Sequence, residues 1–438
     1  MKVLSSGTPE FKNALANLGK RRERLFSEYG TEVDIALGHY QQHREIALVD
    51  WARQHDEVTL KESDLWVDES HIKKAYKHVP SDVRKAIDHA VERVQRFQEE
   101  LKLDSFSTQE EAGVYWGTQV RPLDRVGIYV PGGRANYFTT LILCAVPART
   151  AGVKELIVAT PPKARLEKPF VEPALLYAAK LLDIDKILVS GSVGALAALA
   201  YGTKNEAPVD KIVGSGNGRT AVAKVRLSAV VGTDGLTGPS ETAFLCDSSS
   251  NVESVAADII GRADRDPEAE IYVFQSDAKW LQKLVEELAR ALSQVRDDSS
   301  RTGAQQCLEK HTLIFKTKSI NEGIELVNEI APGVLCLVVD QAASYVSQIQ
   351  KCGSILLGHF TPPVSIELVG GPSGTVPTLG SAAYSLSMSP ASFVRRFTVM
   401  EFDQSALERF EQESVELSQE EGFHTHEASY RKRLPDGD

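Results

Sequence analysis

Three glycine-rich turns follow short apolar runs, and turns of this kind can hold a phosphate group or a small substrate. They are PGG at 131–133, GSGN at 214–217 and GGPSG at 370–374. In an open α/β sheet, ligands bind beside the carboxyl ends of the strands, where such turns lie. The alternative is that these are ordinary turns. No GxGxxG motif follows a predicted strand and opens a helix in either half of the chain.

Four polar side chains stand close to predicted strand or helix ends and could act on a ligand. His359 directly follows the apolar run SILLG, and Ser240 lies in the segment GPSE. Arg262 and Arg265 are three residues apart, which places them on one face of a helix. The alternatives are a loop histidine, a turn-closing serine and two surface arginines that pair with neighbouring aspartates.

The elements that must position these residues alternate between strands and helices. From residue 125 the runs VGIYV, ELIVAT, KILVS and KIVG read as strands, and the runs between them read as helices. This alternation is typical of a parallel α/β sheet. The same alternation of strands and helices repeats from TAFLC onward. Before it, residues 81–102 repeat apolar side chains every three or four positions, which predicts an amphipathic helix.

The sequence therefore predicts an α/β fold with two α/β domains and helical extensions at both ends. A helical N-terminal region covers 1–114. The first α/β domain covers 115–241 and 381–390, and the second covers 242–380. Residues 391–438 form an acidic, helical C-terminal tail.

Composition and charge narrow the class of protein. A chain of 438 residues with 42% hydrophobic and 25% charged residues is a globular protein of two or three domains. Its formal charge of −11 comes without a basic block, so nucleic acid and anionic membrane are not expected partners. No run approaches the about 18 apolar residues of a membrane span, and the N-terminus lacks a signal-peptide core. Five scattered cysteines indicate reduced thiols and a cytoplasmic protein.

A series of sequence segments resembles those of one known family and follows the same order along the chain. VGIYVPGG, GSVGALAALAYGT, KIVGSGN, DGLTGPSE, SILLGHFTP and FVRRFTV are similar to histidinol dehydrogenase, from about residue 20 to 435. The resemblance implies two incomplete Rossmann-like domains and a homodimer with swapped helical ends. It also implies two NAD-dependent oxidation steps, from L-histidinol to histidine, that use a zinc ion and a glutamate–histidine pair.

This chain departs from the family where the chemistry is done. The family's Pro-Glu-His-Leu, which carries the proton-transfer pair, is replaced by PGVL at 332–335. The positions that match the four zinc ligands hold Arg262, Arg265, Glu367 and His426. A guanidinium group is always protonated and cannot ligate a metal, so the sequence predicts no metal site.

The nucleotide and substrate positions are partly kept. Tyr129 and Asn217 match family contacts to NAD, but Gly194 replaces a glutamine. Arg134 and Arg219 stand where the family has small or aromatic residues. NAD is therefore a possible cofactor that is not favoured, and zinc is not expected.

The candidate site combines these residues. His426, Glu367 and His359 are the predicted catalytic residues. Arg262, Arg265, Ser240 and Glu421 are predicted to bind substrate, with Gly374 on the position of a substrate-pocket histidine.

Three hypotheses of function stay open. The favoured one is a zinc-free enzyme of specialised metabolism that acts on a small organic substrate by a non-redox isomerisation, elimination or ring-forming (cyclase) step. The others are an NAD-dependent alcohol dehydrogenase and a catalytically inactive paralogue. A homodimer is expected in each case, with each tail completing the partner's pocket.

Overall fold

The computed structural model describes residues 2–133 and 135–434. Contacts divide the chain into two compact units. The main unit consists of residues 1–101 and 123–393, and the tail unit consists of residues 102–122 and 394–438. None of the described helices is both long and apolar enough to cross a membrane.

The main unit contains two parallel sheets, and the first has the strand order β6-β5-β4-β7-β8. Except for the edge strand β8, its strands are almost wholly buried because helices cover both faces, which explains their continuous apolar sequences. They are β4 (Arg125–Tyr129), β5 (Glu155–Thr160), β6 (Lys186–Val189), β7 (Lys211–Val213) and β8 (Gly232–Thr233).

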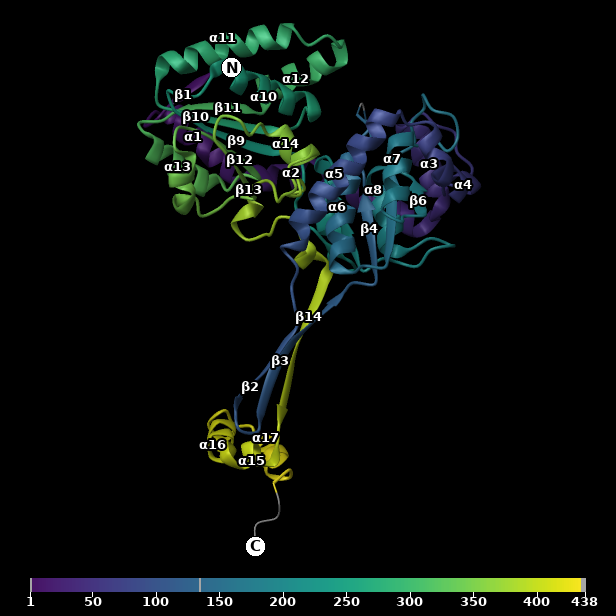
Figure 1. The fold of residues 1–438 in the computed structure, drawn as a ribbon, viewed down its shortest axis with the longest axis vertical. Coiled ribbons are helices and arrows are strands. Elements are labelled where there is room, and N and C mark those ends of the chain that lie inside the picture. Colours follow the sequence, from purple (N-terminus) through teal and green to yellow (C-terminus); the bar gives the residue numbers. More distant parts are fainter. Residues whose placement is uncertain (1, 134, 435–438) are drawn as a thin grey trace. The chain divides into compact units, whose positions relative to one another are not determined.

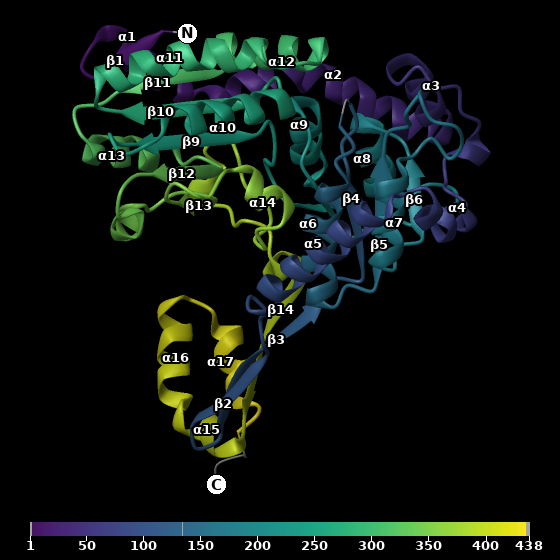
Figure 2. The same ribbon diagram turned by 45° about the horizontal axis from the view of Figure 1, so that its top comes forward.

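Two groups of helices pack around this sheet (Figure 2). The chain runs from β4 to β6 in one direction and then returns past β4 to β7, so its right-handed crossovers place α6 and α7 on one face and α8 on the other. The first group is α5 (Ser81–Glu99), α6 (Phe138–Ala151) and α7 (Pro173–Leu181); the second is α2 (Arg21–His43), α3 (Glu45–His55), α8 (Ser192–Tyr201) and α9 (Gly218–Leu227).

The second sheet has the order β1-β11-β10-β9-β12-β13 and is also parallel throughout. Helices α10, α11 and α12 share one apolar core with it, and α1 and α13 share another on the opposite face (Figure 1). Its strands are β1 (Val3–Ser5), β9 (Glu241–Cys246), β10 (Glu270–Gln275), β11 (Thr312–Lys316), β12 (Val334–Val338) and β13 (Ser354–Leu357). The helices are α1 (Pro9–Gly19), α10 (Val252–Arg265), α11 (Ala278–Ser293), α12 (Asp298–Lys310) and α13 (Ile320–Ile330).

Short elements complete the main unit. They are η1 (Glu62–Asp64), α4 (Glu69–Lys74), η2 (Ala75–Lys77), η3 (Ala342–Gln348), α14 (Val364–Leu368), η4 (Ser381–Ala383) and η5 (Pro390–Phe393). The five cysteines form no disulfide, and four of them are buried.

The tail unit contains an antiparallel sheet of order β14-β3-β2 and three helices. The strands are β2 (Phe106–Glu111), β3 (Val114–Pro122) and β14 (Val394–Phe402), and the helices are α15 (Gln404–Arg409), α16 (Glu411–Glu420) and α17 (His424–Arg431). β14 pairs with β3 along nine residues, from Val394 opposite Pro122 to Phe402 opposite Val114.

The α/β fold class with two Rossmann-like sheets is confirmed, but three segments predicted as helical are strands. Residues 394–402 form β14, because VRRFTVMEF is rich in β-branched and aromatic residues that favour strands and pairs with β3 over its whole length. Residues 106–111 form β2, and residues 3–5 form the edge strand β1 beside β11. Edge strands of three to six residues are too short for periodicity to reveal.

Candidate functional site

A cavity of about 650 Å³ lies in the main unit, a size typical of a small-molecule site. The first sheet reaches it with the turns that follow its strands, including Gly132, Ser192 and Asn217. The second sheet reaches it from the opposite end of its strands, with Ser240 and Glu241 at the start of β9 and Asp266 before β10.

Three charged side chains form an ion cluster on the second-sheet side of the cavity. Arg262 donates from Nε to the hydroxyl of Thr242 at 3.1 Å and pairs with Oε1 of Glu367. Arg265 lies 3.0 Å from the other oxygen, Oε2, of Glu367. The side chains of Arg262 and Glu367 are 8% and 10% exposed, and that of Arg265 is 29% exposed. The arginines are therefore pocket residues rather than a surface pair.

Helix α10 positions both arginines. The helix begins at an N-cap, where the side chain of Asn251 accepts the amide hydrogen of Ser254, and it ends at Arg265. Three-residue spacing places the two guanidinium groups on one face of the last turn, where cations also interact favourably with the helix dipole. The guanidinium group of Arg265 also lies over the ring of Tyr137, with its Cζ atom 5.1 Å from the ring centroid.

Ser240 lines the cavity and is held by an acid. Its amide and hydroxyl both donate to Oδ2 of Asp266, at 2.9 and 3.2 Å. The next residue, Glu241, is buried, accepts from Tyr272 at 3.1 Å and pairs with Arg21 at 3.1 Å. Burial raises the pKa of the Glu241 carboxyl. Glu241 is thus engaged in a structural network.

Tyr129 and Asn217 line the first-sheet side. The hydroxyl of Tyr129 accepts from the amide of Ser192 at 3.1 Å, and burial raises its pKa to about 12. Asn217 is the N-cap of α9, and its side-chain oxygen accepts from the amide of Thr220 at 3.2 Å. Arg134 lies outside the described residues.

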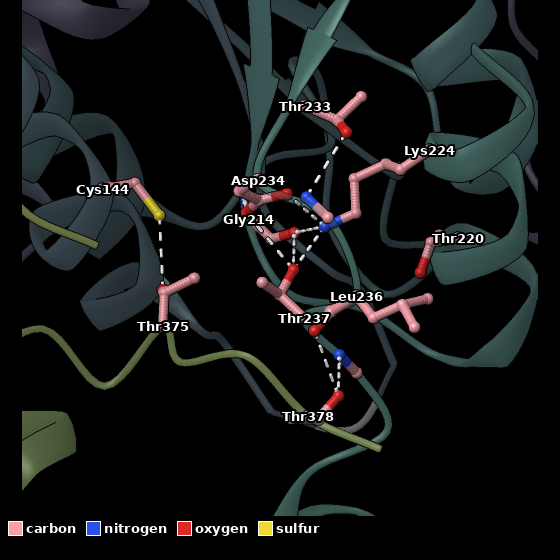
Figure 3. A network of polar contacts seen from close by, with 12 residues as sticks. Cys144, Gly214, Thr220, Lys224, Thr233, Asp234, Leu236, Thr237, Thr375 and Thr378 are labelled. Atoms are coloured by element: carbon pink, nitrogen blue, oxygen red, sulfur yellow. Dashed lines mark hydrogen bonds and ion pairs between the residues drawn. The ribbon is translucent and has the colours of Figure 1, made fainter. Parts of the chain in front are cut away.

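A buried lysine holds the turn at 214–217, as Figure 3 shows. Nζ of Lys224 donates to the carbonyl of Gly214 at 2.8 Å, contacts Oδ1 of Asp234 at 2.6 Å and bonds the hydroxyl of Thr237. These bonds tie α9 to the turn and to the segment that leads to Ser240. No sequence pattern indicates this lysine, because a single lysine in a helix gives no signal.

His359 is not among the residues that line this cavity, so its predicted catalytic role gains no support from the cavity and stays a prediction. It follows β13, is exposed, and its Nε2 lies 3.3 Å from the hydroxyl of Ser249, which follows β9. Both residues stand at the carboxyl edge of the second sheet, whereas the cavity lies at the amino edge. The prediction assumed that both sheets face the site with the same edge.

His426 and Glu421 belong to the tail unit and are not among the residues that line this cavity. Both are exposed, and His426 stacks on Phe423 with ring centroids 4.7 Å apart. His426 also lines a smaller cavity of about 280 Å³ with Leu407, Tyr430 and two neighbours. Within the main unit, the described structure brings together Glu367, Arg262, Arg265, Ser240, Tyr129 and Asn217 around this cavity.

The positions that match the family's chemistry do not present its groups. A Cβ at Gly333 would lie 2.8 Å from the carbonyl oxygen of Pro377 and 3.1 Å from Val376, so no side chain fits there without a shift. Val334 is buried in β12. Among residues 2–133 and 135–434, no three His, Cys, Asp or Glu side chains lie together so that they could hold a metal ion.

The end of α3 forms a cavity wall that no sequence pattern indicates. Trp51, His55 and Asp56 line it, and Trp51 lies against Gly194. The segment carries no motif, and its contacts are with residues far along the chain.

Comparisons with known proteins agree with the fold. The family model for histidinol dehydrogenase matches residues 20–434. The chain is 31% identical to a histidinol dehydrogenase of Clostridium acetobutylicum, over 99% of both chains, and 35% identical to one of Geobacter sulfurreducens, over 89% of both. The crystal structure of histidinol dehydrogenase from Elizabethkingia anophelis superposes with a TM-score of 0.89 at 26% identity, over 99% of this chain and 98% of that one. The chain belongs to the histidinol dehydrogenase family.

Proposed function

We propose that this member of the family is a zinc-independent enzyme that binds a small organic substrate through an anionic group. It then transforms that substrate by a non-redox step, an isomerisation, elimination or ring closure. The observation that carries the proposal is the ion cluster of Arg262, Glu367 and Arg265 in the cavity. Two guanidinium groups share one carboxylate, so the three side chains together carry one positive charge.

The chemistry of the cluster does not fit zinc. Guanidinium groups have no lone pair to donate and repel a cation. Both oxygens of Glu367 are already engaged, one by each arginine. The same cluster fits an anion, because charge-assisted bonds from arginine to carboxylate or phosphate are strong.

The proton-transfer positions support a change of reaction. Gly333 has no room for a side chain, and Val334 cannot titrate. A positioned acid or base usually contributes on the order of 10²–10⁴ in rate, so the loss of both argues against the family's oxidation. Positioning and hydrogen bonding within the cavity remain available to a step that needs no hydride acceptor.

Arg265 is the group that we assign to substrate. It is more exposed than Arg262, and among the described residues its side chain contacts Glu367 and the ring of Tyr137. Its other N–H groups can therefore bind an anionic group in the cavity, which Ser240 also lines. Arg262 is buried and holds Glu367 in place.

The test combines zinc, NAD and L-histidinol. Metal-stripped protein is titrated with zinc and with NAD by calorimetry, and NADH formation from L-histidinol is followed by absorbance. We expect no tight zinc binding and no NADH. One tightly bound zinc per chain together with NADH formation would reject the proposal.

A second function is favoured by the first-sheet side of the same cavity. Tyr129 and Asn217 line it at positions that match NAD contacts, next to the glycine turn at 131–133. They support an NAD-dependent alcohol dehydrogenase that works without zinc. Saturable NAD binding in the same titration, with zinc binding absent, would favour this reading.

We also propose a homodimer in which the tail unit contacts a second copy. The tail sheet leaves large apolar side chains exposed, which is unusual for a surface in water: Phe106, Tyr115, Trp116, Phe397, Val399 and Met400. His426 and Glu421 would then reach the partner's cavity. Light scattering tests the dimer, and a monomer that retains full activity would contradict it.

A further inference from the structure

One wall of the cavity plays no part in the function proposed above. It is formed by the end of α3, where Trp51, His55 and Asp56 line the cavity beside Tyr129. The indole of Trp51 lies directly against Gly194 of α8. A Cβ at position 194 would come within 1.9 Å of Cε3 and 2.0 Å of Cζ3 of the indole. The indole therefore occupies the space where any other side chain at this position would begin.

Asp56 is the acid in this wall. Burial raises the pKa of its carboxyl to about 6. Among the described residues, that carboxyl has no hydrogen bond or ion pair, and burial is the one cause of its raised pKa.

The other acids that line the cavity all have partners. Glu32 pairs with Arg219 at 2.7 Å, and Glu241 pairs with Arg21 at 3.1 Å. Asp266 accepts from Ser240, and Glu367 from both arginines of the cluster. Within the described residues, Asp56 is thus the lining carboxyl without a partner. An unpaired, partly buried carboxyl costs stability, and one that lines a cavity is a candidate for binding a ligand.

We propose that Trp51 and Asp56 bind a protonated amine attached to a flat ring, so that the cavity takes a zwitterionic ligand. The indole face attracts the cation and stacks on the ring, and the carboxylate accepts a charge-assisted hydrogen bond from the amine. The anionic end of the same ligand is assigned to Arg265, and only that half of the ligand rests on the function proposed above.

The wall favours an amine over a dinucleotide. A pyrophosphate is anionic, and an ionised Asp56 without a cationic partner repels it. Tyr129 of β4 interacts electrostatically with Asp56, and the cavity lining also includes His55 from the segment of Asp56 and the paired Glu32 and Arg219. None of these neutralises its charge in the described structure.

Three small probes separate the two ends of the cavity. Benzylamine carries the ring and the cation, benzoate carries the ring and an anion, and benzyl alcohol is the uncharged control. Their dissociation constants are measured by calorimetry at pH 8 with the full chain, in the wild type and in Asp56→Asn. Asp258→Asn is the matched control, because burial also raises the pKa of Asp258 to about 6 but this residue does not line the cavity.

We expect benzylamine to bind the wild type more tightly than benzyl alcohol does. Asp56→Asn should weaken benzylamine by roughly tenfold or more, as expected for a lost bond to a charged group, and should leave benzoate unchanged. Asp258→Asn should leave both unchanged. Arg265→Gln should weaken benzoate alone, so failure of that arm counts against the proposed function and not against the amine site.

The pH dependence adds an independent readout. Because only ionised Asp56 attracts the amine, benzylamine should bind more tightly as the pH rises through about 6. His55→Gln should keep this profile, and Asp56→Asn should flatten it. The proposal is overturned if benzylamine shows no saturable binding, if benzyl alcohol binds equally well, or if Asp56→Asn leaves benzylamine unaffected. It is also overturned if NAD binds and Asp56→Asn abolishes that binding, because the wall would then be a nucleotide site.

Discussion

The two parallel sheets of the main unit are built alike but face the cavity with opposite ends. The first sheet presents the turns that follow β4, β6 and β7, with Gly132, Gly191 and Ser215. The second presents the segments that precede β9 and β10, with Ser240 and Asp266. The first sheet itself therefore contributes glycine turns and backbone, whereas the second side carries the charged side chains at the end of α10.

This difference explains why a common rule for ligand sites in α/β sheets holds for the first sheet and not for the second. Ligands bind at the carboxyl ends of strands in an open α/β sheet, and the first sheet follows that rule. On the second sheet the carboxyl ends carry His359 and Ser249, away from the cavity. The two sides should consequently respond differently to substitution, the first through buried backbone anchors and packing, the second through ion pairs.

The largest effect is expected at the anchor of the first side. Lys224→Met removes an ammonium group that is 1% exposed and leaves Asp234, which is 7% exposed, without its cation. Breaking a buried pair in this way costs about 3–5 kcal/mol of unfolding free energy. Urea denaturation measures it, with Lys204→Met as the control, because the exposed Lys204–Glu62 pair should contribute only about 0–1 kcal/mol. Equal losses in the two variants would show that the network does not anchor the turn.

The second side is tested by Glu367→Gln. The substitution leaves Arg262 buried beside an uncharged amide, whereas Arg265 can turn toward water, so we expect a loss of about 2–4 kcal/mol. Denaturant melts measure it, and Glu69→Gln in the exposed Glu69–Lys73 pair is the control. If Glu367→Gln lowers the unfolding free energy no more than Glu69→Gln does, the ion cluster is not a buried network, and it gives no support to a zinc-free site.

Packing on the first side is tested by Gly194→Ala. The added Cβ would meet the rigid indole of Trp51 at 1.9 Å and Leu48 at 3.1 Å. Overpacking of this kind costs about 1–3 kcal/mol, measured by thermal or urea unfolding. Gly261→Ala in α10 is the matched control, because nothing lies within 4 Å of its Cβ position and the change should be neutral or stabilising. If both variants unfold alike, the indole moves freely and is not a fixed wall.

Much of the main unit could be predicted from its sequence, because its strands are short apolar runs covered on both faces. RVGIY at β4 and ETAFLC at β9 are almost wholly buried, and this burial is what the apolar pattern reports. The strand β14 was predicted as a helix although its β-branched and aromatic residues favour a strand. Its residues are mostly exposed and it pairs with β3, far away in the sequence, so no buried apolar run marks it.

The residues of the candidate site also fall into a group that could be predicted from the sequence and a group that could not. Arg262, Arg265 and Glu367 were found because the resemblance to a family aligned them with a known pocket. Trp51 and Asp56 were not found, because their role depends on a glycine and a tyrosine from other elements. A carboxyl without a partner is a property of the folded structure, and the sequence does not record it.

The smallest effect is expected at two carboxyls, that of Asp56 beside the first sheet and that of Asp258 in α10 beside the second. Burial raises the pKa of both Asp56 and Asp258 to about 6, above the usual value near 4. The folded protein then holds these protons more tightly than the unfolded chain does. Each group therefore lowers stability as the pH rises from about 4 through 6, and the loss stays constant above that range.

Asp56→Asn and Asp258→Asn should each raise Tm at pH 8 and leave it unchanged at pH 4. Because both groups are only partly buried, water screens part of the cost, so we expect a gain of roughly 1–2 °C. Scanning calorimetry across pH 4–8 measures it. With 10 mM benzylamine present, the gain should shrink or reverse for Asp56→Asn alone, because the wild type then recovers the missing partner and the variant does not. A lower Tm for Asp56→Asn at pH 8 without ligand would mean that the carboxylate already has a stabilising partner, and the distinction between the two regions would then rest on the ion cluster alone.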